Sequence, residues 1–153
     1  MPEAPTPSDE KEAGLEIRWV FHAPRNELWR EWTEPERFAD WYGADAEVPL
    51  ESVSMDVRPG GRWSLTMLVG GREIDWDGEY LEVEEPQRLV FTVRDDPTQD
   101  LYELCTVELT ETGDERTEMH FQQTGQMPAE AYKRARQGWA TFFREVDGRL
   151  AGA

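Results

Sequence analysis

The chain has 153 residues and carries 16 Lys and Arg side chains against 33 Asp and Glu, which gives a formal net charge of −17. This length suits one domain with a sizeable core. The negative field would repel phosphate backbones and anionic lipid headgroups, so nucleic acids and membranes are poor candidates as partners. The single cysteine, Cys105, cannot close an intramolecular disulfide, and no apolar run reaches the roughly 20 residues that cross a bilayer. We therefore expect a cytoplasmic protein, and the high charge favours a monomer.

Residues 1–14 combine three prolines with charged and small side chains. Such a composition cannot bury enough apolar surface to offset the entropy lost on ordering. The segment has neither the basic nor the apolar region of a secretory signal. We predict a disordered tail over residues 1–14 and a single domain over residues 15–150.

One strand and two short helices are predicted directly after this tail. Residues 15–21 alternate apolar and more polar side chains at the period of a strand. Residues 24–33 begin with a proline, which the first turn of a helix tolerates, and then repeat apolar side chains at helical spacing. Glu34-Pro35 restarts a second short helix that ends at Gly43.

The segment from residue 44 to residue 125 reads as an antiparallel meander, because apolar residues recur at period two with a turn signal about every ten residues. Gly60-Gly61 and Gly70-Gly71 mark clear turns, since glycine adopts positive φ without steric cost. The opposite face is acidic and is expected to meet water. The side chains assigned to the inner face are Trp63, Leu65, Met67, Ile74, Trp76, Gly78, Tyr80, Leu89, Phe91, Val93, Met119 and Phe121.

A long amphipathic helix is predicted from Pro128 to about Leu150, where it covers the inner face of the sheet. Gly138 lies in the middle of this helix, where glycine costs about 1 kcal/mol relative to alanine. Two explanations fit it: close packing of the helix backbone on the sheet, or room for a ligand beside Trp139. The apolar stripe of the helix comprises Tyr132, Ala135, Trp139, Phe142, Val146 and Leu150.

This order of elements resembles the helix-grip fold of the START-like superfamily, also called SRPBCC, and in particular its branch named for the activator of the heat-shock-protein-90 ATPase (AHSA-type). The resemblance covers nearly everything from Leu15 to Leu150. The motifs that carry it are Ala23-Pro24 with Leu28-Trp29, Trp32-Thr33-Glu34-Pro35-Glu36, Trp41-Tyr42-Gly43, Asp56-Val57-Arg58-Pro59-Gly60-Gly61, Gly78-Glu79-Tyr80, Pro86-Gln87-Arg88-Leu89-Val90-Phe91 and Gly138-Trp139.

The resemblance implies an α+β fold in which a curved antiparallel sheet of about six to seven strands wraps around a long C-terminal helix, with two short helices after the first strand. It also implies an apolar cavity between the sheet and the long helix, which relatives use for lipids, polyketides or other hydrophobic small molecules. Two departures stand out. Members of the branch often show a paired tryptophan followed by Gly-Pro where this sequence has Trp41-Tyr42-Gly43-Ala44. The eukaryotic co-chaperones of the branch carry an additional N-terminal domain.

Catalysis finds little support in the sequence. His22 ends the first strand and His120 falls on the outer face, so neither is placed to activate Cys105 or a serine at the cavity. The carboxylates of residues 73–79 follow one strand face too widely spaced to share one metal ion, so no metal or cofactor is expected. Acid–base groups near the cavity are more often structural, through ion pairs and buried hydroxyls. These groups are Asp56, Arg58, Arg62, Tyr80 and Tyr102.

The sequence therefore predicts binding of a hydrophobic small molecule, such as a lipid, a polyketide or an aromatic compound, between the sheet and the C-terminal helix. The alternative that Trp63, Trp76 and Trp139 simply fill the core stays open. So do two other functions: a co-chaperone-like module that meets a chaperone through the acidic outer face, and a polyketide cyclase-like cavity enzyme. The predicted ligand-binding residues are Trp63, Met67, Trp76, Tyr80, Phe91, Trp139 and Phe143.

Overall fold

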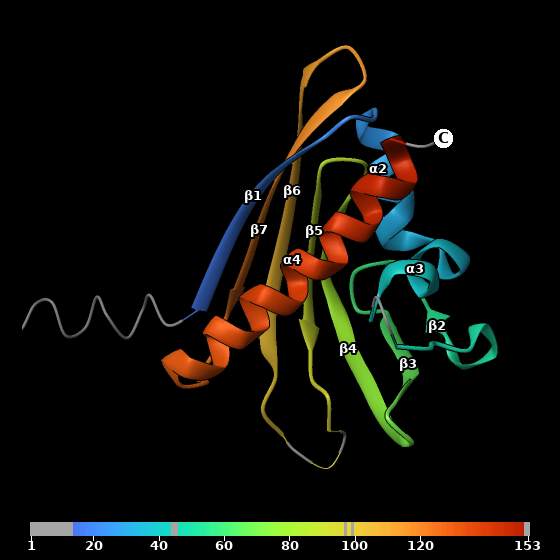
Figure 1. Cartoon of the computed structure of the whole chain (residues 1–153), viewed down its shortest axis with the longest axis vertical. Coiled ribbons are helices and arrows are strands. Elements are labelled where there is room, and N and C mark those ends of the chain that lie inside the picture. Colours follow the sequence, from blue (N-terminus) through green and yellow to red (C-terminus); the bar gives the residue numbers. More distant parts are fainter. Residues whose placement is uncertain (1–13, 44–45, 97, 99, 152–153) are drawn as a thin grey trace, which may run out of the picture.

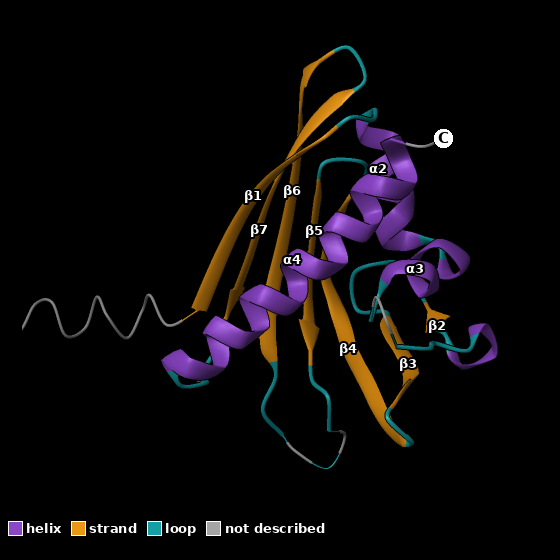
Figure 2. Cartoon of the chain, viewed as in Figure 1, coloured by secondary structure: helices purple, strands orange, loops and turns teal. Residues whose placement is uncertain are grey.

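A computed structural model describes residues 14–43, 46–96, 98 and 100–151 of the chain. Over this part it shows an open seven-stranded antiparallel sheet with one long helix lying diagonally across one face (Figures 1 and 2). The strand order β1-β7-β6-β5-β4-β3-β2 places the last strand beside the first. Two short helices follow the first strand, so the predicted α+β helix-grip architecture is confirmed.

The strands are β1 (Gly14–Phe21), β2 (Ser54–Met55), β3 (Arg62–Val69), β4 (Arg72–Glu84), β5 (Arg88–Val93), β6 (Glu103–Gly113) and β7 (Arg116–Thr124). The helices are α2 (Arg25–Thr33), α3 (Pro35–Trp41), the short 3₁₀ helix η1 (Leu50–Ser52) and α4 (Ala129–Ala151). The tail predicted over residues 1–14 lies outside the described residues, except that Gly14 pairs with Thr124 and therefore already belongs to β1.

The inner face of the sheet follows the predicted alternation. On β3, the side chains of Trp63, Leu65 and Met67 are buried, and the residues between them are more exposed. Gly78 of β4 lies at a close approach of two strands, because a Cβ atom there would stand 1.7 Å from the carbonyl oxygen of Thr92 and 2.5 Å from Nε1 of Trp63. Only a residue without a side chain lets β4 and β5 come together at this point.

The aromatic core lies where α2 and α3 sit beside the C-terminal half of α4 (Figure 1). Trp32 of α2 is at its centre, with its ring centroid 6.0 Å from that of Phe121 and 4.9 Å from that of Trp41. Phe143 of α4 reaches the same ring at 6.1 Å. The two short helices thus supply side chains that fill the space between sheet and long helix in this half of the molecule.

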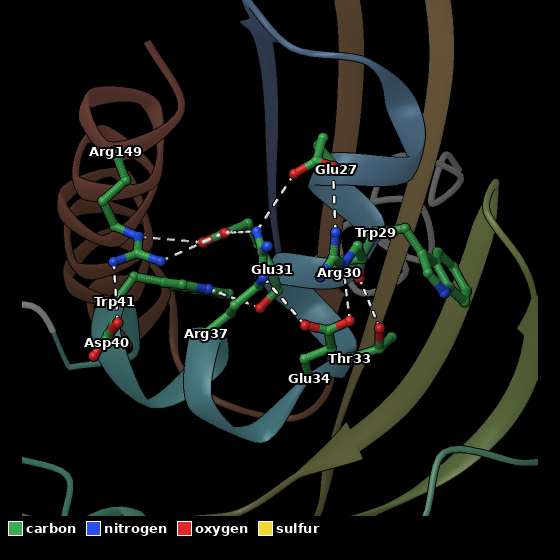
Figure 3. A network of polar contacts seen from close by, with 10 residues as sticks. All are labelled: Glu27, Trp29, Arg30, Glu31, Thr33, Glu34, Arg37, Asp40, Trp41 and Arg149. Atoms are coloured by element: carbon green, nitrogen blue, oxygen red, sulfur yellow. Dashed lines mark hydrogen bonds and ion pairs between the residues drawn. The ribbon is translucent and has the colours of Figure 1, made fainter. Parts of the chain in front are cut away.

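A buried ion-pair network ties the C-terminal end of α4 to α2 and α3 (Figure 3). The Glu31 carboxylate is only 1% exposed and accepts hydrogen bonds from Arg37 at 3.1 Å and from Arg149 at 3.3 Å. Arg149 also reaches Asp40 at 3.1 Å. The Trp41 indole donates to the Glu31 carbonyl oxygen at 2.9 Å. A buried carboxylate requires a compensating positive charge, which Arg37 and Arg149 supply here.

Candidate functional site

A cavity of about 740 Å³ opens under the N-terminal half of α4. Its walls come from residues 93–96 and 100–104 from the end of β5 to the start of β6, residues 123–127 at the end of β7, residues 131–142 of α4, and Tyr42 and Trp76. Small-molecule sites in proteins have volumes of roughly 300 to 1,000 Å³, so this cavity has the size of a ligand site. The cavity lies away from α2 and meets α3 only at its C-cap residue Tyr42, while the side chains of the two short helices fill the other half of the interlayer space.

Aromatic rings form one wall of the cavity. The Tyr42 ring stands nearly perpendicular to Trp76, with centroids 5.6 Å apart, and it lies 5.8 Å from Trp139. Phe142 closes the group at 5.2 Å from Tyr42 and 5.6 Å from Trp139. Burial raises the pKa of the Tyr42 hydroxyl well above its usual value, so this wall is uncharged at neutral pH.

A chain of hydrogen bonds holds the polar side of the cavity. The Trp139 indole donates to Oε1 of Gln123 at 2.7 Å, and the amide nitrogen of Gln123 donates to the Glu103 carboxylate at 3.2 Å. The backbone N–H of Gln126 donates to the same carboxylate, also at 3.2 Å. Burial and a hydrogen bond to Glu103 raise the pKa of Tyr132 to about 12, so its hydroxyl keeps its proton. These bonds fix the orientation of the Trp139 ring and of the Glu103 carboxylate.

Gly138 borders the cavity on α4. A Cβ atom built on this residue would meet nothing within 4 Å outside the backbone of its own helix turn, so close packing against the sheet is the wrong explanation for this glycine. The missing side chain leaves space in the cavity beside Trp139 instead. An alanine at this position would be compatible with the fold and a larger side chain would enter the cavity.

The seven residues predicted to bind ligand fall into two groups in the structure. Trp76 and Trp139 line the cavity. The remaining five lie in the packed half of the core and do not reach it. Three of them border a separate void of about 10 Å³, which holds at most about one water molecule. The five are Trp63, Tyr80 and Phe91, which border the void, and Met67 and Phe143, which are 5% and 1% exposed.

Apart from Tyr102, the polar residues of the cavity were not predicted, although two of them carry a signal in the sequence. Gln123 continues the inward series of Met119 and Phe121 on β7, and Glu103 shares the inward parity of Cys105 on β6. A polar side chain at an inward position near a strand end indicates the edge of the apolar core, where a binding site can form.

One edge of the cavity mouth is fixed by an ion pair. Arg94 donates to the Asp77 carboxylate at 2.7 Å, and the backbones of the same two residues form an isolated bridge. The Arg94 hydrogen bond keeps the pKa of Asp77 below its usual value, so the carboxylate is charged at neutral pH. The Arg94 guanidinium also lies 4.5 Å above the Tyr102 ring. The Tyr102 side chain is therefore held at the mouth by a cation–π contact.

The acid–base candidates of the sequence do not gather around the cavity. Asp56 and Arg58 pair with each other on the surface, at 2.9 Å. Arg62 pairs with Asp77 at 3.0 Å, and burial raises the pKa of the Tyr80 hydroxyl. Of the five candidates, Tyr102 alone lines the cavity. Among the residues that the structure describes, no group of three or more His, Cys, Asp or Glu side chains is arranged to hold a metal ion.

None of the described helices is both long and apolar enough to span a bilayer.

Cys105 is fully buried among apolar side chains, and burial raises the pKa of its thiol well above the usual value. A thiol of this kind is not nucleophilic at neutral pH. The described residues around the cavity instead provide a wall of aromatic rings and the Glu103 carboxylate.

Comparison with known proteins places this geometry in a family. The model of the family described as activator of Hsp90 ATPase homolog 1-like protein matches residues 22–151. A search of curated proteins found no match. Among solved structures, a protein from Nitrosomonas europaea is 26% identical, with a TM-score of 0.72 over 92% of this chain and 96% of that chain.

Two further structures have the same fold at lower identity. The AHSA1 protein from Silicibacter pomeroyi is 20% identical, with a TM-score of 0.77 over 91% of this chain and 98% of that chain. An HSP90 activator from Plasmodium falciparum is also 20% identical, with a TM-score of 0.72 over 91% and 96% of the two chains. Because the family model spans most of its length, the chain belongs to the family of activator of Hsp90 ATPase homolog 1-like proteins.

Proposed function

We propose that the chain binds a hydrophobic small molecule, of the class of lipids, polyketides or aromatic compounds, in the cavity under the N-terminal half of α4. The observation that carries the proposal is the cavity of about 740 Å³ with its wall of aromatic rings. Family membership supports a helix-grip module that is either ligand-binding or co-chaperone-like. The cavity favours the first of these.

Exposed apolar side chains at the mouth add to this argument. Leu101 is 65% exposed and Leu104 is 38% exposed, and both line the cavity. Isolated exposed leucines are common, but these two line the same cavity as the aromatic rings. A ligand that filled the cavity and covered them would remove apolar surface from water, which stabilises the complex by about 25 cal/mol per Å². The mouth therefore extends the surface that an apolar molecule can cover.

A two-dimensional amide NMR titration tests the proposal directly. Labelled protein is titrated with a panel of fatty acids, sterols, flavonoids, aromatic polyketides and alkyl amines, and the tryptophan indole N–H signals are followed. We expect saturable shifts of the Trp76 and Trp139 signals, because both rings line the cavity. The Trp32 and Trp41 signals should change little, because these rings belong to the packed core. The absence of any saturable shift across the panel would contradict the proposal.

Docking on a chaperone is the second candidate, favoured by the family description and by the HSP90 activator from Plasmodium falciparum that shares the fold. The acidic outer face of β4 would meet a basic surface of the partner. Glu73 and Asp75 are exposed there, whereas Asp77 is already paired with Arg62 and Arg94. The same spectra separate the two functions, because a docked chaperone would shift outer-face amides of β3 and β4 and leave the two cavity indoles unchanged.

A further inference from the structure

We infer that the cavity prefers an apolar molecule that carries a protonated amine over one that carries a carboxylate. This inference rests on the proposed function, because it names the chemistry of the ligand in the same cavity. It is carried by two features that act in the same direction. One is the excess of carboxylate groups around the cavity, and the other is the set of aromatic rings in its wall.

Negative side chains outnumber positive ones around the cavity. Among the described residues of the lining, four carboxylates stand against two guanidinium groups, which leaves two negative charges in excess. One of these guanidinium groups, that of Arg94, is already paired with Asp77, which lies outside the lining. The charged lining residues are Asp95, Asp96, Asp100 and Glu103, with Arg94 and Arg134. The excess would repel a ligand carboxylate and attract an ammonium group.

Glu103 is the carboxylate best placed to meet the ligand. Its hydrogen-bond donors are the side-chain amide of Gln123 and the backbone N–H of Gln126. Both are neutral groups, and no Lys, Arg or His within the described residues forms an ion pair with Glu103. The donors orient the carboxylate without cancelling its charge. A ligand cation would supply the positive partner that Glu103 lacks and would donate a charge-assisted hydrogen bond to the carboxylate.

The aromatic wall favours the same kind of ligand. The faces of aromatic rings carry partial negative charge, and cages of such rings recognise ammonium groups. Tyr42, Trp76 and Trp139 lie together in the cavity wall. Trp139 donates a hydrogen bond to Gln123, and Gln123 donates one to Glu103, so the carboxylate is connected to this wall. An aromatic ring at the cavity mouth already binds a cation in this way, because the Arg94 guanidinium lies 4.5 Å above the Tyr102 ring. An alkyl or aromatic body against the rings, with its amine toward Glu103, satisfies both features.

Three probes that differ only in the head group test the inference: decylamine, 1-decanol and decanoate. An alkyl amine is protonated at neutral pH, as a lysine side chain is. Binding to the intact chain is measured at pH 7 by isothermal titration calorimetry. We expect decylamine to bind at least about tenfold more tightly than decanoate, with decanol in between.

A pair of matched variants then assigns the preference to one residue. Glu103→Gln keeps the shape of the side chain and removes its charge, so it should weaken decylamine binding by about tenfold and decanol binding by much less. Glu73→Gln makes the same change of net charge at an exposed position on the outer face, and it should leave all three affinities unchanged. Thermal unfolding of both variants checks that they fold.

The outcomes separate the inference from the function on which it rests. Decanoate binding as tightly as decylamine in the unmodified chain would overturn the inference and leave the proposed function standing. An equal loss of decylamine affinity in Glu103→Gln and Glu73→Gln would also overturn it, because the attraction would then be that of the whole acidic protein. If none of the three probes bound, both proposals would fall.

Discussion

A Gly138→Trp variant should lose binding of every cavity ligand, by at least about a hundredfold, while the protein stays folded. Gly138 borders the cavity, and a Cβ atom there would meet no neighbour within 4 Å outside its own helix turn. The indole therefore enters the cavity without displacing the sheet, and it occupies the space that a ligand needs. Calorimetric titration of any ligand found by the NMR panel measures the loss.

Two control variants separate occlusion from damage to helix α4. Gly138→Ala adds only a methyl group and should keep ligand binding while raising the free energy of unfolding by about 0.5 to 1 kcal/mol, since alanine favours the helix. Gly148→Trp makes the same large substitution in the same helix at an exposed position away from the cavity, and it should bind ligand normally. Undiminished binding by Gly138→Trp would mean that the ligand sits somewhere else.

The double variant Arg37→Met and Arg149→Met should lower the free energy of unfolding by about 3 to 5 kcal/mol. Both guanidinium groups contact the Glu31 carboxylate, which is 1% exposed (Figure 3). Their removal leaves a buried charge without a partner, and this is the costly way to break a buried ion pair. Urea unfolding followed by circular dichroism measures the change.

Adding Glu31→Met to this double variant should restore most of the lost stability, because replacing all members of a buried ion pair by apolar side chains is often close to neutral. A triple variant no more stable than the double would show that the buried charge is not the cause of the loss. Arg144→Met serves as the surface control, since Arg144 is exposed and its guanidinium donates to the Thr141 hydroxyl at 3.3 Å, and it should change stability by less than about 0.5 kcal/mol.

The fold follows from local patterns in the sequence. The period-two alternation of the residues that became β3, β4 and β7 assigns their inner faces, and the spacing of Tyr132, Trp139 and Val146 assigns the buried face of α4. The turns fall where glycine pairs such as Gly70-Gly71 allow positive φ. Each of these features depends on residues close together in the chain, which a single sequence displays.

The position of the cavity along the sheet could not be predicted from these local patterns. Parity places Trp63, Phe91 and Trp76 on one face, but it does not say which of them lies under α2 and α3 and which lies under the open half of α4. That division depends on where two short helices pack, through contacts between distant segments. Five of the seven predicted residues therefore belong to the filled half of the core.

The ion pair between Glu31 and Arg149 could not be predicted from local patterns either. Glu31 comes three residues after Leu28, on the buried side of α2, so a buried carboxylate could have been suspected from the helical period. Its partner Arg149 is 118 residues away at the far end of α4. No local pattern connects the two, and the pairing emerges only when α4 is laid across the sheet.

The central claim is that an apolar molecule occupies the cavity under α4, and intermolecular nuclear Overhauser effects on a complex test it most directly. A ligand from the NMR panel is mixed with isotope-labelled protein, and contacts between ligand and protein protons are recorded. The account predicts contacts to Trp76, Trp139 and Phe142, which line the cavity. Contacts confined to exposed apolar side chains away from it, such as Leu50 and Leu81, would contradict the claim.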